Sequence, residues 1–165
     1  MFHDLATWQK IAFVYNLSLT REVARWERLA KEPTLFGRLG EVLKMHLGHD
    51  IAYALEAGKI AANASVEGNI DLSFIEKKLS VNLPNHVLQM QLLESANKIA
   101  DCALKTIAHA GCHSDQIDRV VFVGGSSLLG IIQNRIGALF PKAKLETSEV
   151  FTAVVGGLAI ASGRI

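Results

Sequence analysis

The sequence predicts a mixed α/β chain, in which a helix-rich part with a small hairpin precedes a strand–helix–strand–helix layer. Apolar residues recur at helical spacing through much of residues 1–112. Apolar and polar residues alternate over residues 65–83, as in paired strands. The run "VVFV" at residues 120–123 is uninterrupted and ends at two glycines. Such a run is typical of a strand buried on both faces of a parallel sheet.

Composition excludes several classes of protein. The chain has 165 residues, of which 50% are hydrophobic and 20% charged, as in a globular protein. Its formal net charge is +1 and its basic residues are scattered, so we expect no nucleic-acid partner. Its apolar stretches reach about ten residues, half of the ~20 that a membrane span needs, so we expect no membrane partner.

The two cysteines and the first residues indicate a cytoplasmic protein. Cys102 and Cys112 lie ten positions apart in one predicted helix, about 15 Å along its axis. That separation is too long for a disulfide, so both are expected to be reduced. The opening "MFHDLATWQK" lacks the basic start and the apolar core of a secretory signal.

The helix-rich part, residues 1–112, is expected to contain three long patterns after a first apolar segment. One begins at a cap, Ser18 or Thr20, and stops at Pro33. The next runs from residue 35 to about 63 with four glycines inside it. The hairpin at 65–83 follows, and then a helix with Pro84 in its first turn.

The terminal part, residues 113–165, follows the order strand, helix, strand, helix. Ser126 or Ser127 is expected to cap the first of these helices, and "AKLET" at 143–147 is the second strand. The last helix, "FTAVVGGLAIAS", is apolar on all sides, which predicts deep burial. The boundary between the two parts is expected near residues 112–117.

The glycine turn at residues 124–125 does not match three known chemistries. A serine nucleophile needs a histidine, and the last histidine, His113, precedes the turn. A phosphate-binding P-loop needs a lysine where Ile131 stands, and the glycine order of a dinucleotide fingerprint is absent. The turn can then hold a phosphate, take a flat ring against its backbone, or serve only as a connection.

Gly156 and Gly157 form a second adjacent pair inside the last helix. Each costs about 1 kcal/mol relative to alanine in a helix, which suggests that something approaches this backbone closely. The glycine turn is the expected neighbour, and packing of the helix on the sheet is the alternative.

Three motifs together resemble one family. "VVFVGGSSLLG" ends a strand in Val-Gly-Gly-Ser, "TAVVGGLAIAS" is a later glycine-bearing helix, and "ALEAGKIAANAS" carries Glu-x-x-Lys at Glu56 and Lys59. In this order they resemble the DnaK-type heat-shock chaperone ATPases of the actin-like ATPase superfamily, and most of all the short YegD-like members. The resemblance covers about residues 40–165 and implies part of an actin-like ATPase lobe, namely the C-terminal part of its nucleotide-binding domain.

The resemblance implies a split site for the adenosine of ATP or ADP. On one side, Gly124, Gly125 and Ser126 would face the ribose and base, and Leu129 would pack on the base. On the other, Glu56 and Lys59 would bond to the ribose hydroxyls and Asn63 would reach the base. These last three share one helix face, because they are spaced i, i+3 and i+7.

The sequence departs from the family at three positions of this site. Ile60 and Leu128 stand where the family has two cations that stack on the adenine, so a more apolar pocket is expected. The acid before the last helix falls near Val150, one position from Glu149.

The family's phosphate-binding loops and its Mg²⁺-binding Asp-x-Gly-x-Thr acids have no match in the sequence. Phosphoryl transfer depends on such positioning and charge neutralisation. We therefore expect the adenosine half of an ATP site, with the rest of the ATPase domain as partner and Mg²⁺ only in the full-length protein. Whether this chain is itself an enzyme stays open.

Two other functions remain open. Amphipathic segments in residues 1–48 fit a helical interaction or dimerisation module, and an exposed lobe interface would make a homo-oligomer. A fragment of a sugar or metabolite kinase of the same superfamily is the second. Trp8 and Trp26 fit core or interface positions. Two clusters have the residue types of metal ligands, and no metal is expected: His46, His49 and Asp50, and His109, Cys112 and His113.

Overall fold

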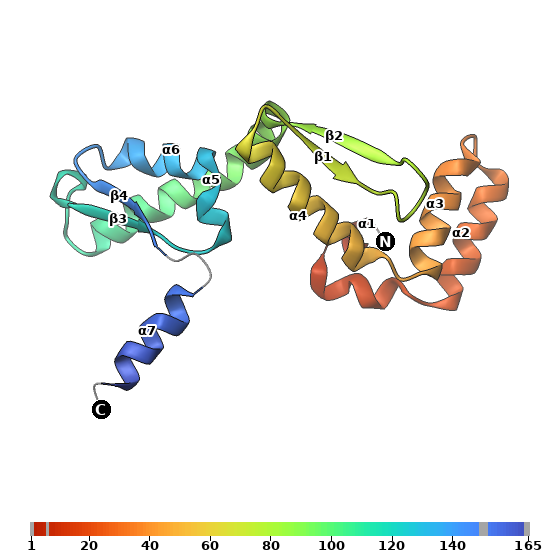
Figure 1. Ribbon diagram of the computed structural model, residues 1–165, viewed down its shortest axis with the longest axis horizontal. Helices are drawn as coiled ribbons and strands as arrows, with labels where there is room; N and C mark the ends of the chain where they lie inside the picture. The colour runs from red at the N-terminus through yellow and green to blue at the C-terminus, as the bar shows by residue number, and fades with distance from the viewer. Residues whose placement is uncertain (1, 6, 149–151, 164–165) are drawn as a thin grey trace. The chain divides into compact units, whose positions relative to one another are not determined.

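The computed structural model describes residues 2–5, 7–148 and 152–163 of the chain (Figure 1). In these residues the fold is mixed α/β and mostly helical, with two small sheets, as the sequence predicts. The helices and strands are, in order, α1 (Phe2–Leu5), η1 (Trp8–Val14), α2 (Leu17–Leu29), α3 (Pro33–Lys44), α4 (Gly48–Ala64), β1 (Glu67–Asp71), β2 (Ser80–Pro84), α5 (Asn85–His109), η2 (Ser114–Gln116), β3 (Arg119–Phe122), η3 (Gly125–Leu128), α6 (Gly130–Leu139), β4 (Lys144–Thr147) and α7 (Ala153–Ser162).

The chain divides into two compact units, Met1–Leu88 and Gln89–Ile165, called unit 1 and unit 2 below. The division falls near the start of α5, so most of that helix belongs to unit 2. Each unit has its own two-stranded sheet and its own buried cluster, and each is described by itself.

The helical hairpin α2–α3 forms much of unit 1. The side chain of Asn16 caps α2 by accepting a hydrogen bond from the N–H of Leu19 at 2.9 Å, so the expected caps Ser18 and Thr20 lie inside the helix. Pro33 begins α3 in place of stopping α2, because a proline ring suits the first helical turn. The buried cluster of this region consists of Val14, Val23 and Leu43, with Tyr15, Leu19, Trp26 and Leu39 packed against it.

The long pattern at residues 35–63 is two helices. Residues 45–47 separate α3 from α4, and His46 there has a φ of +57°. The ring of His46 stacks on that of Tyr15 at 4.2 Å, and the Tyr15 hydroxyl accepts a hydrogen bond from the N–H of Gly48 at 2.8 Å. A tertiary contact therefore determines where α4 begins.

The hairpin β1–β2 is antiparallel, as predicted, and packs on α4 through two glycines. A Cβ on Gly68 would lie 2.5 Å from the carbonyl oxygen of Gly58 and 2.6 Å from the backbone nitrogen of Ala62. A Cβ on Gly58 would lie 2.6 Å from Cγ1 of Ile70. The helix and strand thus approach to backbone contact, which only glycine allows.

One ion pair ties the tip of this hairpin to α3. The guanidinium of Arg38 donates two hydrogen bonds to the carboxylate of Glu76, at 2.6 and 3.0 Å. These bonds lower the pKa of Glu76 and raise that of Arg38. The bidentate geometry makes this the type of surface pair that contributes measurably.

Unit 2 contains the parallel pair β3–β4, joined by α6 as a crossover helix. One face of this sheet is covered. Phe122 from β3 packs with Ile136 of α6 and with Phe140, the residue after α6, in a buried cluster, and Ala103 and Ile107 of α5 pack against it. α5 ends before Gly111, which has a φ of +67°, as expected for a glycine past a helix end.

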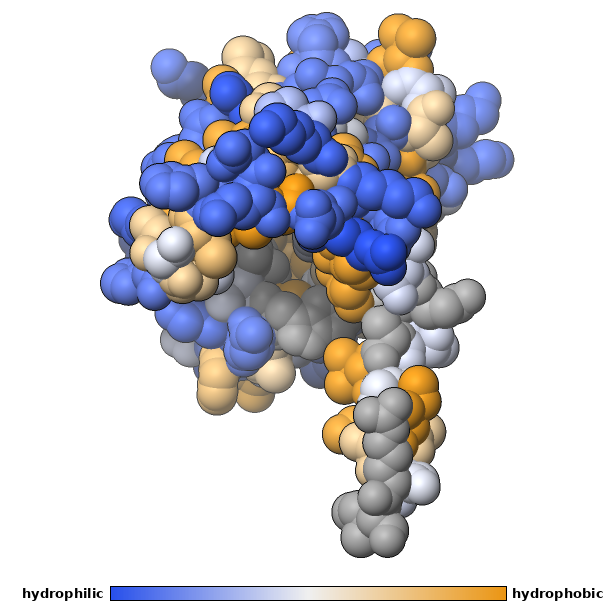
Figure 2. Space-filling view, turned by 90° about the vertical axis from the view of Figure 1, so that its left-hand side faces the viewer, coloured by the Kyte–Doolittle hydropathy of each residue, from blue (hydrophilic) through white to orange (hydrophobic). Residues whose placement is uncertain are grey.

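Two expectations for unit 2 are wrong. β3 is not buried on both faces, because Val121 remains 50% exposed on the face opposite Phe122. α7 is not buried, because Val154, Val155, Leu158 and Ile160 are between 63% and 70% exposed. Figure 2 shows hydrophobic atoms on the surface of α7. An apolar composition predicts that a helix will be covered, but not that the covering surface is in the same chain.

The Gly68 contact predicts a large difference between two glycine substitutions in unit 1. Gly68→Ala is expected to destabilise the protein by about 1–3 kcal/mol, because its methyl group would press on backbone atoms that cannot rotate away. Gly40→Ala, inside α3, is the control, since its Cβ would lie 4.0 Å from the side chain of Val23 in α2. It should stabilise by up to about 1 kcal/mol. Urea denaturation measures both, and equal effects would contradict the close approach.

The Arg38–Glu76 pair predicts a dependence of stability on pH. The folded-state pKa of Glu76 lies below its ordinary value of 4.5, so the pair stabilises the fold above that pH. Its contribution disappears as the pH falls through the lowered pKa. Glu76→Gln should therefore lower the urea midpoint at pH 7, and this effect should shrink progressively as the pH is lowered below 4.5. Glu94→Gln, which alters an exposed pair within one helix, is the control. A Glu76→Gln effect that stays constant as the pH is lowered would count against this role.

Candidate functional site

The glycine turn follows the carboxyl end of β3 in unit 2. Gly124 has φ +85° and ψ 154°, a region of backbone space that essentially only glycine adopts. A Cβ placed on it would meet no atom within 4 Å. The backbone conformation, and not crowding, is therefore what requires glycine here. Gly125 then opens the short helix η3, and Leu129 leads into α6.

Hydrogen bonds from one serine hold the turn closed. The hydroxyl of Ser127 donates to the carbonyl oxygen of Gly124 at 2.6 Å, and its N–H donates to the same oxygen at 3.0 Å. The side-chain amide of Gln133 donates to the carbonyl of Ser127 at 3.0 Å. Gly125 and Ser126 are exposed, and Leu129 is half-buried. Ser127 therefore has the structural role, while Ser126 faces solvent.

An apolar cleft of about 390 Å³ lies beside this turn. It is lined by α5, α6, the whole of residues 120–123 and the two serines 126 and 127. It runs along β3 and reaches the turn at the carboxyl end of this strand through Ser126 and Ser127. Gly124, Gly125 and Leu129 do not line it.

The predicted polar residues of the other half lie on α4 in unit 1. Glu56 and Lys59 form an ion pair with each other across one turn of the helix, and both are partly exposed. Asn63 lies one turn further on and lines a separate hollow of about 460 Å³ with Ser65, Asn85 and His86. Glu56 and Lys59 are therefore neighbours on α4, as their spacing predicts, whereas Asn63 lines a different hollow.

The seven predicted residues fall into two groups, one in each unit. Glu56, Lys59 and Asn63 belong to unit 1, and Gly124, Gly125, Ser126 and Leu129 to unit 2. The positions where the family has stacking cations, Ile60 and Leu128, are both exposed apolar residues. Glu149 lies outside the described residues.

Among residues 2–5, 7–148 and 152–163, the second glycine pair has no close neighbour. A Cβ on Gly156 or on Gly157 would meet nothing within 4 Å, so neither the glycine turn nor another element presses on α7 there. The predicted approach of Gly156 and Gly157 to Gly124 is therefore not seen. The glycines of α7 remain without a packing reason.

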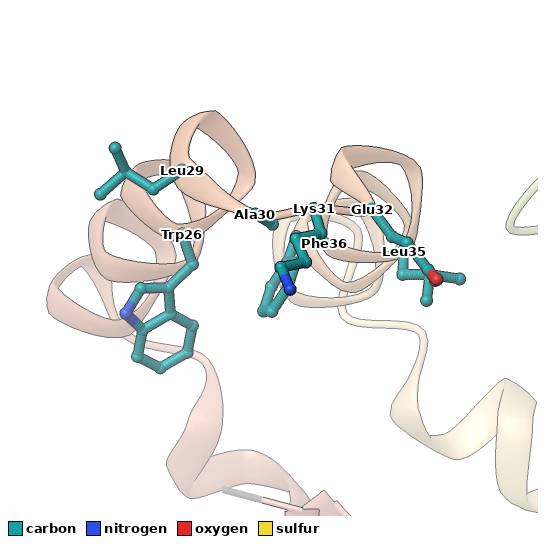
Figure 3. A pocket seen from close by; sticks show the side chains of 7 residues that line it. All are labelled: Trp26, Leu29, Ala30, Lys31, Glu32, Leu35 and Phe36. Carbon is teal, nitrogen blue, oxygen red and sulfur yellow. The ribbon is translucent and has the colours of Figure 1, made fainter.

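An apolar groove in unit 1 was not predicted. Trp26, Leu29, Leu35 and Phe36 line a hollow of about 710 Å³ at the connection between α2 and α3, with Ala30, Lys31 and Glu32 (Figure 3). The rings of Trp26 and Phe36 meet edge to face at 6.1 Å, and Leu29 is 75% exposed. The sequence signal was the set of amphipathic segments in residues 1–48, which includes Trp26, and this pattern is equally typical of a core face.

The described residues form neither a cluster of metal ligands nor a membrane-spanning helix. Over residues 2–5, 7–148 and 152–163, no three His, Cys, Asp or Glu side chains gather as metal ligands would. Within the same residues, no helix has the length and apolarity needed to span a bilayer. Cys102 and Cys112 are free thiols. No protein-family model matches the chain.

The conformation of Gly124 predicts the effect of adding a methyl group. Gly124→Ala should destabilise the protein by about 1–3 kcal/mol, because alanine cannot adopt this φ and ψ without strain. Gly157→Ala is the matched control in the same unit. It has equal open space but helical backbone, so it should stabilise by about 1 kcal/mol. If both variants gained stability in urea denaturation, the turn would not need its unusual backbone.

Proposed function

We propose that this chain supplies the adenosine-binding half of an ATP or ADP site, as part of a DnaK-like molecular chaperone ATPase. The observation that carries the proposal is the glycine-only conformation of Gly124 at the carboxyl end of an apolar parallel strand, beside an apolar cleft. A side-chain-free corner of this kind lets a flat ring approach backbone closely.

The chemistry of the ribose contacts fits the ion pair on α4. Glu56 has a carboxylate that accepts hydrogen bonds, and Lys59 has an ammonium that donates them. A ribose offers two adjacent hydroxyls, each of which can donate and accept. Replacing the direct ion pair with these hydroxyls leaves both charges partnered. This arrangement follows the resemblance in the sequence, in which Glu56 and Lys59 bond to the ribose hydroxyls, Asn63 reaches the base, and the glycine turn faces both ribose and base.

The proposal restricts which part of the nucleotide this chain recognises. The sequence has no Asp-x-Gly-x-Thr segment, and no P-loop lysine follows the glycine turn. Binding should therefore depend on the nucleoside and not on its phosphates. Mg²⁺ would be held by acids of the full-length ATPase.

Calorimetric titration with adenosine, ADP and ATP tests the proposal. Adenosine and ADP should bind with similar Kd values, since the sequence has no phosphate-binding motif to contact the phosphates of ADP. Glu56→Gln should weaken adenosine binding about tenfold, because a charged hydrogen bond to ribose becomes a neutral one. Glu94→Gln, on α5, is the control and should bind as the parent does. Affinity that rises steeply with each phosphate contradicts an adenosine half-site, and failure of all three to bind contradicts nucleotide recognition.

A helical interaction module is the second candidate, and the groove at Trp26 and Phe36 favours it. Aromatic side chains in an exposed apolar hollow are common at the centre of protein–protein interfaces. This candidate predicts that the chain does not bind adenosine and that Trp26→Ala weakens its association with a protein partner.

A further inference from the structure

The proposed function uses the cleft that residues 120–123 help to line, but it does not use the unpaired backbone groups along the open edge of β3. In β3–β4 pairing, the carbonyls of Asp118 and Phe122 accept hydrogen bonds from the N–H groups of Lys144 and Ser148, at 2.8 and 3.0 Å. Even-numbered residues of β3 thus direct their backbone groups toward β4. Those of the odd-numbered residues point the opposite way. Among the described residues, β3 pairs only with β4, so the backbone groups of Val121 meet no strand.

This edge lacks the devices that keep sheet edges from pairing. Natural proteins protect such edges with lysine, proline, bulges or covering segments. Residues 120–123 are Val, Val, Phe and Val, without a charge or a proline. Val121 and Val123 are 50% and 46% exposed, and the 390 Å³ apolar cleft is lined by all four residues.

We infer that two copies of this chain pair through the edges of β3, antiparallel and centred on Val121, to make one four-stranded sheet, β4–β3–β3–β4. The two Val121 residues then exchange both of their backbone hydrogen bonds. The inference specifies a surface for self-association and does not depend on nucleotide binding.

Charge favours the antiparallel arrangement of two identical edges. The edge has one charged residue, Arg119, at its start. Parallel pairing in register would place the two Arg119 side chains side by side. Antiparallel pairing sets each opposite Val123 of the other copy and separates the two charges by roughly 13 Å along the strands. Glu146 of β4 also lies 3.6 Å from Arg119, which offsets its charge within each copy.

The buried area requires a contribution from α7. Two four-residue strands alone bury far less than the roughly 1,200–2,000 Å² of a stable interface. α7 has ten residues, about 15 Å of helix, and its apolar side chains are exposed. In the dimer, the exposed side chains of Val121 and Val123 form an apolar surface against which the two α7 helices can pack. We therefore expect α7 to contribute to dimerisation.

Sedimentation equilibrium of the intact chain, from micromolar to millimolar concentration, tests this inference. The parent chain should form a dimer, and Val121→Lys should raise its dissociation constant about tenfold or more, because two lysines would face each other at the centre. Val81→Lys is the matched control, an exposed valine on a strand of unit 1, and should leave the constant unchanged. Leu158→Asp should also weaken the dimer.

Cross-linking gives a second measurement that does not rely on a destabilising lysine. In a chain with Cys102→Ser and Cys112→Ser, Val121→Cys should form a disulfide dimer on mild oxidation. Its two Cα atoms would lie about 5.5 Å apart, which is within the range for a disulfide. Val81→Cys should not form one. A chain that stays monomeric at every concentration overturns the inference, as does a dimer that Val121→Lys leaves intact. Nucleotide titration is a separate measurement, so the two proposals can fail independently.

Discussion

The structure of unit 2 depends on one apolar strand that is covered on one side only. Phe122 of β3 is buried against α6, while the side chain of the adjacent Val121 is half-exposed to solvent. The parallel partner β4 and the crossover helix follow from this strand, and so does the glycine turn that must reverse the chain at its end. The same strand therefore creates the cleft beside the turn and leaves one edge of the sheet open.

Local patterns predicted the elements of this fold well and their tertiary surroundings poorly. The hairpin, the parallel pair and the end of α5 at Gly111 follow from alternation, an apolar run and a glycine with positive φ. The break before α4 did not, because it rests on Tyr15, more than thirty positions away. The prediction that α7 is buried was wrong for a similar reason, because burial depends on contacts between segments that are distant in the sequence. Hydropathy predicts that an apolar segment will be buried, but which surface buries it depends on the rest of the fold.

The candidate site also shows this difference between what local sequence patterns predict and what depends on tertiary contacts. Glu56 and Lys59 could be placed together from their spacing, since i and i+3 residues are neighbours on any helix. The need for glycine at 124 could be inferred from the end of the strand, although its specific backbone conformation could not. The role of Ser127 as the turn's internal donor, and the groove beside Trp26, depend on three-dimensional neighbours that spacing does not reveal.

The exposed apolar helix α7 also has a consequence for the lifetime of the protein in a cell. Chaperones and proteases in cells continuously remove molecules that are unfolded for part of the time, and an exposed apolar segment such as α7 is a feature that folded and unfolded molecules of this chain would share. If such proteins bind the exposed helix, copies whose α7 is covered would persist longer than copies whose α7 is uncovered. The cellular abundance of the chain would then follow the supply of whatever shields the helix, independently of the rate of its synthesis.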